Sequence, residues 1–164
     1  MTFLGNKLGS GLKKPMKRNE VPAVYGEEYN IGNWNCGYVS LPGVVVLFVT
    51  TQDDTSALEI GNYEGQGWMK KKDAGQVGSR FRWMSQNATS PDSKRGREIL
   101  ENKKPIHVWV REHKRKNGGR FTYQGSFTSV SYKREWEWKF NKKVARGMKV
   151  VLQKLKGNIN NVNS

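Results

Sequence analysis

The sequence predicts a β-rich α+β domain, built as a barrel or strongly bent sheet with two helices. Segments with strand-like alternation or β-branched composition outnumber segments with helical periodicity. Turn sequences rich in Gly, Asn, Asp and Ser separate several of these segments. The chain has 164 residues, including six Trp, six Tyr and six Phe, which is enough for one domain with a real core.

The first expected strand is the β-branched run at residues 43–51, which is long enough for one buried strand. A polar turn at 52–56 follows, and residues 58–63 are a weaker strand candidate. Residues 64–79 mix Gly, Lys and Gln, which indicates a long loop.

Residues 81–86 alternate between apolar and polar side chains. Phe81 and Trp83 would share one side of a strand, and Arg80 and Arg82 the other. This pattern predicts a half-buried strand with a basic outer face.

A helix is expected near residues 91–102. Ser90 is a favourable N-cap, Pro91 suits the first helical position, and Asp92 is favoured by the helix dipole. The helix should end before Pro105, because the residue before a proline avoids helical geometry.

Three further strand signals follow. Residues 106–111 alternate, and the Asn-Gly-Gly sequence within 116–120 indicates a hairpin turn. Residues 121–132 predict either two strands or one strand bent at Gly125. The alternating aromatic residues of 136–140 predict a last strand.

Residues 142–156 are expected to form a basic amphipathic helix. Its apolar side would consist of Val144, Met148, Val151, Leu152 and Leu155. Gly147 would cost this helix roughly 1 kcal/mol relative to alanine.

We expect a flexible basic arm at 1–19, a single β-rich nucleic-acid-binding domain at 20–156 and a frayed Asn-rich tail at 157–164.

Charge is the most unusual property of the sequence. The net charge is +15 and the pI is about 10.0. Residues 21–66 contain six acidic and no basic residues, whereas residues 67–164 contain 24 basic and seven acidic residues. A charge coat for solubility would mix the signs more evenly. This distribution predicts a polyanionic partner, most simply nucleic acid.

Several other classes of protein are disfavoured. The longest apolar run, residues 44–49, is far too short to span a membrane, and no secretory signal is recognisable. A single cysteine, Cys36, excludes a disulfide framework and a cysteine-based zinc site. We therefore expect a cytoplasmic protein with no membrane association, cofactor or small-molecule substrate.

The signals for catalysis are weak. His107 and His113 lack metal-ligand spacing. A PD-(D/E)xK nuclease pattern starts at Asp92, but Glu101 would lie about 14 Å along the same helix, too far to share a metal. Glu137 is an alternative partner for Asp92. A small metal-dependent nuclease and an RNA-binding accessory protein therefore remain alternatives to a non-catalytic DNA-binding module.

The segment from 80 to 97 is the best candidate for contact with double-stranded DNA. Its candidate residues are Arg80, Arg82, Trp83, Ser85, Gln86, Asn87, Thr89, Ser90, Lys94, Arg95 and Arg97. The cations can neutralise phosphates, and Gln or Asn can bond to an adenine edge. The hydroxyl groups near the helix start suit a phosphate. Trp83 could stack on an extruded base, although its strand position favours the core.

Several ordered blocks between about residues 40 and 140 resemble a known family. These blocks are Val45–Thr50, Phe81–Gly96, Ile106–Arg111, Phe121–Gly125 and Val130–Tyr132. They are similar to an uncharacterised domain at the C-terminal end of bacterial DEAD/DEAH-type helicases, often with a phospholipase-D-like or HNH nuclease elsewhere in the chain. The positions that match the family pattern are Trp83, Ser85, Gln86, Thr89, Ser90, Pro91 and Gly96, and Met84 replaces its usual glutamine.

The resemblance implies a DNA-recognition module of a restriction or phage-defence system, which could sense sequence or base modification. It also implies a pseudobarrel similar to those that read DNA. The 164 residues contain no helicase or nuclease sequence. Three alternatives therefore stay open: an excised domain, a stand-alone reader, or a mobile-element protein that acts with a separate helicase or nuclease.

Overall fold

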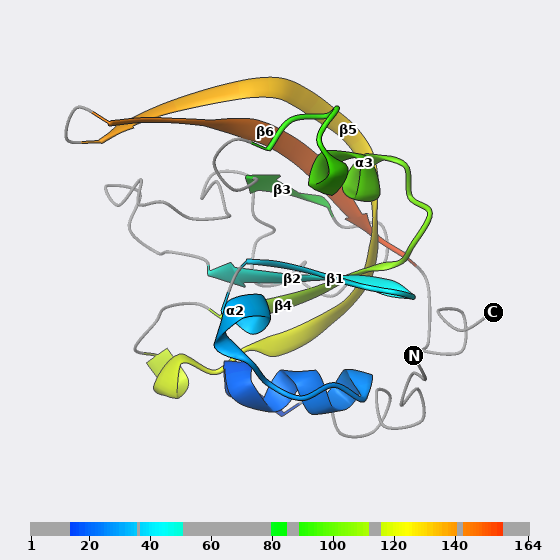
Figure 1. Ribbon diagram of the computed structural model, residues 1–164, viewed down its shortest axis with the longest axis vertical. Helices are drawn as coiled ribbons and strands as arrows, with labels where there is room; N and C mark the ends of the chain where they lie inside the picture. Colours follow the sequence, from blue (N-terminus) through cyan, green and yellow to red (C-terminus); the bar gives the residue numbers. More distant parts are fainter. Residues whose placement is uncertain are drawn as a thin grey trace.

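In the part of the chain that the structure describes, six strands form one mixed sheet in the order β1-β2-β4-β5-β6-β3 (Figure 1). The computed structural model describes residues 14–35, 37–50, 80–84, 89–111, 116–140 and 143–155. The strands are β1 (Tyr38–Leu41), β2 (Val44–Thr50), β3 (Arg80–Met84), β4 (Ile106–Arg111), β5 (Thr122–Phe140) and β6 (Lys143–Lys154). The helical elements are η1 (Arg18–Tyr25), α2 (Ile31–Trp34), α3 (Lys94–Leu100) and η2 (Lys116–Gly119). β2 and β4 are parallel, and the other pairs of these strands are antiparallel.

The sheet bends along β5, which belongs to both of its halves. Residues 122–127 pair with β4, and β5 pairs with β6 from Phe127 onward. Gly125 has φ of 108°, which side chains of L residues rarely tolerate, and the β4–β5 register shifts beside it between Val108 and Trp109. The half formed by β3 and β6 therefore folds over the half formed by β1, β2 and β4 (Figure 1). The predicted bent sheet, with one strand bent at Gly125, is confirmed.

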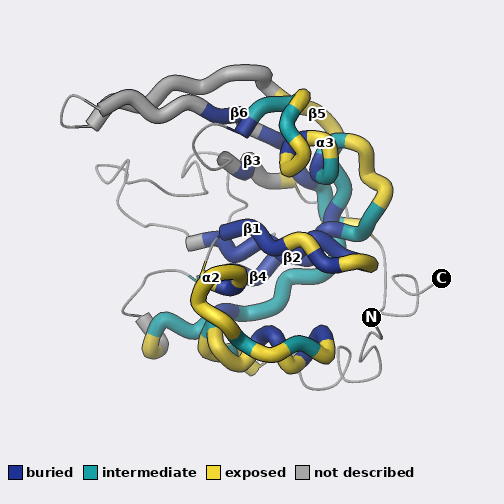
Figure 2. The backbone as a smooth tube through the Cα atoms, in the orientation of Figure 1, coloured by how far each residue is buried: buried dark blue, intermediate teal, exposed yellow. Residues whose placement is uncertain are grey.

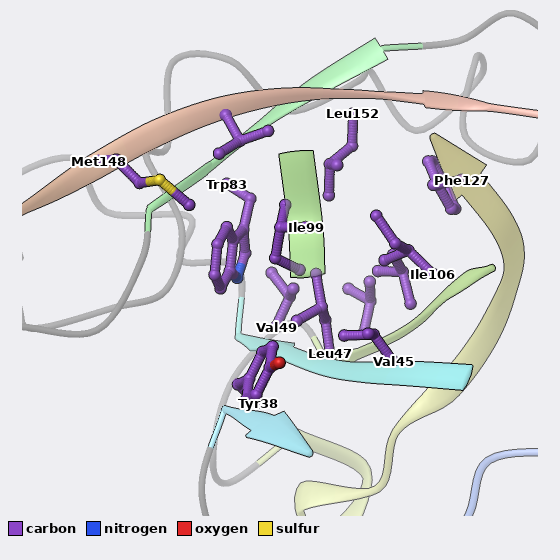
Figure 3. Packing of buried hydrophobic residues seen from close by; sticks show 13 residues of the cluster. Tyr38, Val45, Leu47, Val49, Trp83, Ile99, Ile106, Phe127, Met148 and Leu152 are labelled. Carbon is purple, nitrogen blue, oxygen red and sulfur yellow. The ribbon is translucent and has the colours of Figure 1, made fainter. Parts of the chain in front are cut away.

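An inner core fills the space between the two halves. It consists of Tyr38, Val45, Leu47, Val49, Trp83, Ile99, Ile106, Val108, Val110, Phe127, Met148, Val150 and Leu152. Figure 3 shows residues of β2 facing Met148 and Leu152 of β6, with Ile99 of α3 between them. Burial of these side chains against both halves stabilises the bend, because each half supplies only one wall of the core.

A second core lies on the other face of β1, β2 and β4, under η1 and α2. Its buried members are Val21, Val24, Tyr25, Trp34, Val39, Leu41, Val44, Val46, Phe48, Trp109 and Phe121. Every residue from Ile106 to Val110 is consequently buried, although we expected only alternate positions to face inward. Figure 2 shows β1 and β2 buried between the helical layer and the rest of the sheet.

The second core contains a buried polar network. Tyr25 Oη lies 2.8 Å from Nδ1 of His107 and accepts a hydrogen bond of 2.9 Å from Nε1 of Trp109. Burial lowers the pKa of His107 to about 3, so the imidazole is neutral near pH 7. The His107 ring also packs against the rings of Tyr25 and Tyr123, at centroid distances of 5.6 and 5.3 Å. These contacts indicate a structural role for His107 within the second core.

The predicted helix at 142–156 is wrong, because β6 occupies residues 143–154. Met148, Val150 and Leu152 are buried at alternate positions, which is the period of a strand and not of a helix. β5 and β3 supply hydrogen-bonding partners on both sides of this segment. Hydrogen bonding to a strand on each edge stabilises the extended conformation of this segment. This pairing outweighs the helical spacing of its apolar residues, on which the predicted helix was based.

The other predicted elements have mixed outcomes. The helix near 91–102 is present but shorter, and η2 connects β4 to β5 at the predicted hairpin turn. β1 was not predicted, and the expected strand at 58–63 and loop at 64–79 lie outside the described residues. Within the expected basic arm, Met16 forms a β-bridge with Phe121, so this end of the segment contacts the domain.

Candidate nucleic-acid interface

The candidate segment from 80 to 97 contributes to two different surfaces. Arg80 is exposed at the start of β3, and its Nε donates a 2.9 Å hydrogen bond to Oε1 of Gln153 on β6. Trp83 faces the inner core, and strand alternation places Arg80 on the opposite face. Ile99 anchors α3 in the same inner core. Arg80 and the exposed side of α3 therefore lie on opposite sides of the β3–β6 half.

Trp83 is not available to stack on a base in this structure. Only 1% of its surface is exposed, and Figure 3 shows its ring within the inner core. The alternation of its strand indicated this position, because Trp83 shares a face with apolar residues. The proposed contact between Trp83 and an extruded base is thus corrected to a packing role.

Ser93, and not Ser90, caps α3. The Ser93 hydroxyl accepts a hydrogen bond from the Gly96 amide at 3.2 Å and donates one to the Ser90 carbonyl at 2.7 Å. Pro91 and Asp92 form a turn before the helix. Ser90 is half-buried and bonds to Ser93 through its backbone amide and carbonyl, and Thr89 is buried, with 7% of its surface exposed.

The exposed side of α3 is cationic. Lys94, Arg95 and Arg97 are all exposed, and the first turn of the helix contains no acidic residue. The Arg95 guanidinium lies 5.4 Å from the ring centroid of Tyr38, which holds it at the side of the helix facing β1. The seven-residue helix α3 therefore brings these three predicted site residues close together.

Glu98 is the acidic residue of α3. It accepts hydrogen bonds from residues of β1 and forms an ion pair with Lys104. The hydroxyls of Tyr38 and Ser40 donate hydrogen bonds to its Oε2 at 2.7 and 2.5 Å, and Lys104 Nζ lies 3.5 Å from the same oxygen. Burial raises the pKa of Glu98, but these donors and the lysine charge outweigh burial and lower it. Glu98 is therefore a charged anchor for α3.

A groove of about 340 Å³ runs beside α3. Its residues come from α2, β1, α3 and the segment before α2. Lys94 and Arg95 lie on one wall, and Glu27 and Glu28 line it from the N-terminal segment. Carboxylates can accept hydrogen bonds from exocyclic amino groups of bases while cations contact phosphates. Glu27 and Glu28 were missed by the sequence reasoning, although they stand out as acids in the segment without cations.

The remaining predicted contacts are less fully described. The backbone of Arg82 pairs with that of Val151 on β6. Ser85, Gln86 and Asn87 lie outside the described residues, between β3 and α3.

Within the described ranges, no group of three His, Cys, Asp or Glu residues could hold a metal ion. Glu101, one of the acids in the nuclease alternative, pairs with Lys103 at 2.8 Å. Every helix in the described part of the chain is too short or too polar to cross a lipid bilayer.

The fold and this site define a β-rich domain with a bent mixed sheet and a cationic helix beside a groove. The family model described as "Domain of unknown function (DUF3427)" matches residues 12–161, and the chain belongs to this family. No curated protein matches the chain.

Three solved structures are similar to the chain. Arabidopsis thaliana SUVH6 in complex with SAM has a TM-score of 0.51 and 14% identity, with 96% of this chain and 28% of SUVH6 covered. AspBHI, described as a DNA modification-dependent restriction endonuclease, has a TM-score of 0.48 and 14% identity, with 75% of this chain and 63% of AspBHI covered. The DNA recognition domain of LpnPI, a cytosine modification-dependent restriction endonuclease, has a TM-score of 0.48 and 11% identity, with coverages of 79% and 67%. The chain spans only part of each of these proteins, and the likeness to SUVH6 concerns the fold alone.

Proposed function

We propose that the chain is a non-catalytic module that recognises double-stranded DNA in a restriction or phage-defence system of the cytoplasm. The observation that carries this proposal is the cluster of Lys94, Arg95 and Arg97, all exposed on α3, while Glu98 is held by other partners. A cationic cluster of this kind suits the phosphates of a duplex.

Residues 85–88, which lie between β3 and α3 in the sequence, are the proposed source of sequence readout. Gln86 and Asn87 have the amide groups that form paired hydrogen bonds with adenine. The cations of α3 would set the position of the module on the duplex, and these amides would read base edges. As the sequence resemblance implies, a separate helicase or nuclease would act on the DNA that the module selects.

Titration of labelled duplex DNA over a salt series tests the proposal. We expect affinity to fall steeply between about 50 and 200 mM salt, because each phosphate contact releases counterions. The titration is made with unmodified duplexes and with duplexes that contain methylated cytosine. A difference in affinity between the two shows that the module senses modification. AspBHI and LpnPI are described as modification-dependent, which guides the choice of this probe. Affinity that is independent of salt would overturn the proposal.

Two controls separate the alternatives. Competition with RNA should leave the duplex bound, whereas preferential displacement by RNA would favour the accessory RNA-binding function. Incubation of DNA with Mg²⁺ or Mn²⁺ should leave it intact. Cleavage that is lost on substitution of Asp92 or Glu137 would instead favour the nuclease.

A further inference from the structure

Two hollows border α3, and their charged residues give them opposite formal charge. In the groove of about 340 Å³ described above, acids outnumber cations, and the charged residues are Glu27, Glu28, Glu98, Lys94 and Arg95. The second hollow has a volume of about 300 Å³, and we call it the basic hollow. It is lined by Lys94, Arg97, Glu98, Glu101, Lys103 and Lys104. Because four cations face two acids there, a polyanion is attracted to the basic hollow more strongly than to the groove.

The basic hollow runs along one side of α3. Lys94, Arg97 and Glu101 are spaced by three and then four residues, which places them on one face of the helix. Lys103 and Lys104, from the segment after the helix, line the hollow beside the C-terminal end of α3. Lys94, Arg97 and Lys103 are exposed, so a ligand in solution can reach all three charged groups.

Both acids of the basic hollow are already bound by donors of the protein. Glu98 accepts the hydrogen bonds from β1 and pairs with Lys104, as described above. Glu101 pairs with Lys103 at 2.8 Å, in a contact that leaves 80% of the Lys103 side chain exposed. Lys94 and Arg97 form no ion pair with any residue in the described ranges. The cations of the hollow therefore keep an excess of charge for an anionic ligand.

We propose that the basic hollow binds a backbone phosphate of DNA, with Lys94, Arg97 and Lys103 as its contacts. The inference rests on the proposed function and specifies on which side of α3 the DNA backbone lies. A guanidinium offers two parallel donors that match two phosphate oxygens, and a lysine adds a compact charge. The negative C-terminal end of the helix dipole opposes an anion here, so side-chain cations must hold the phosphate.

This placement has two consequences for the candidate interface. Lys103 becomes a phosphate contact, although it lies outside the segment from 80 to 97 that the sequence indicated. The backbone also stays away from Glu27 and Glu28, whose carboxylates would repel phosphates. The groove is thereby left to groups of the DNA that carry hydrogen-bond donors, such as the amino groups of bases.

Salt titrations of labelled duplex DNA with variants of the full chain test the proposal. Lys103→Gln and Arg97→Gln should each reduce the slope of log K against log salt by about one, because each removes one phosphate contact. The double variant should reduce it by about two. Glu101→Gln removes an acid beside the phosphate, so it should strengthen duplex binding at low salt by about two- to threefold.

The opposite effects of the two partners separate phosphate binding from a structural role of their ion pair. Lys103→Gln and Glu101→Gln break the same 2.8 Å contact, so a purely structural role would weaken duplex binding in both variants. Lys103→Arg keeps the positive charge and should retain the slope of the unaltered chain. Thermal unfolding confirms that each variant is folded, as expected for substitutions of exposed side chains.

Lys17→Gln is the charge-matched control, because Lys17 is exposed and lines neither hollow. It should leave the slope unchanged, and a reduction equal to that of Lys103→Gln would overturn the inference. Weaker binding in both Lys103→Gln and Glu101→Gln would overturn it as well.

The outcome for the unaltered chain distinguishes this inference from the proposed function. If the unaltered chain binds duplex DNA with a steep salt dependence, while Lys103→Gln and Glu101→Gln bind exactly as it does, the basic hollow holds no phosphate and the proposed function stands. If the unaltered chain shows no salt-dependent duplex binding, the proposed function fails and this inference fails with it.

Discussion

Gly96 packs directly against the carbonyl of Ser90, so that a Cβ atom at position 96 would lie 1.8 Å from the Ser90 oxygen. The close approach lets the turn before α3 fold back on the helix, where Ser93 bonds to both residues. The site that presents the three cations of α3 therefore depends on the absence of a side chain at one position.

Gly96→Ala should destabilise the protein by about 2 kcal/mol or more, because backbone atoms must move to make room for the methyl group. Chemical denaturation measures the effect. Gly32→Ala is the control, since its Cβ would meet its nearest neighbour, Asn30 Oδ1, at an ordinary 3.6 Å. Equal stability of Gly96→Ala and the unaltered chain would contradict the packing described here.

Tyr38→Phe should lower stability by about 1–2 kcal/mol, because it removes a hydrogen bond to a charged carboxylate. Tyr38 donates to Glu98 at 2.7 Å and so ties α3 to β1. Tyr132→Phe removes a hydroxyl from an exposed tyrosine and should change stability by less than about 0.5 kcal/mol. Thermal unfolding of the two variants makes the comparison.

His107 should make stability depend on pH in a definite window. Its folded-state pKa is about 3, whereas the ordinary value is 6.5, so between these values the unfolded chain binds a proton that the folded chain does not. The free energy of unfolding should therefore fall as pH decreases through this window, by up to about 1.4 kcal/mol per pH unit.

His107→Gln isolates this contribution, because glutamine keeps a polar group but does not ionise in this range. The unaltered chain should be more stable near neutral pH, and the difference should shrink as pH falls towards 4. Denaturant titrations at several pH values measure it. A difference that does not change with pH would refute the buried neutral state of His107.

Lys94→Ala should weaken binding to all duplexes alike and reduce the slope of log K against log salt by about one. Gln86→Ala and Asn87→Ala should instead reduce the preference between sequences, with little change in the salt slope. Lys17→Ala, an exposed lysine just before η1, is the charge-matched control. If Lys17→Ala lowers the salt slope as much as Lys94→Ala does, the assignment of the phosphate contacts to α3 is wrong.

Local sequence signals predicted the features that depend on neighbours in the chain. The strand at 106–111, the turn at 116–120 and the bend at Gly125 were recognisable from composition and spacing. The helix start was predicted three residues too early, because Ser90 and Ser93 are both good caps and only the packing against Gly96 distinguishes them.

β6 illustrates what local signals could not provide. Its apolar residues fit both a helical and an alternating pattern, and the choice depends on whether partner strands lie on both edges. β4 gives a second example, because a strand covered on both faces shows no simple alternation of burial. The side of the sheet on which each cation lies also follows from pairing register.

By itself, the sequence determined the strand-rich class, the separation of acidic and basic segments, and the residue types available to contact a polyanion. The tertiary structure alone decided that residues 143–154 form a strand, that Trp83 packs inside, and that Arg80 of β3 and the cations of α3 lie on opposite sides of the β3–β6 half. The physical reason is that composition and short-range periodicity are properties of neighbouring residues. Burial and surface position depend on contacts between segments that lie far apart in the chain.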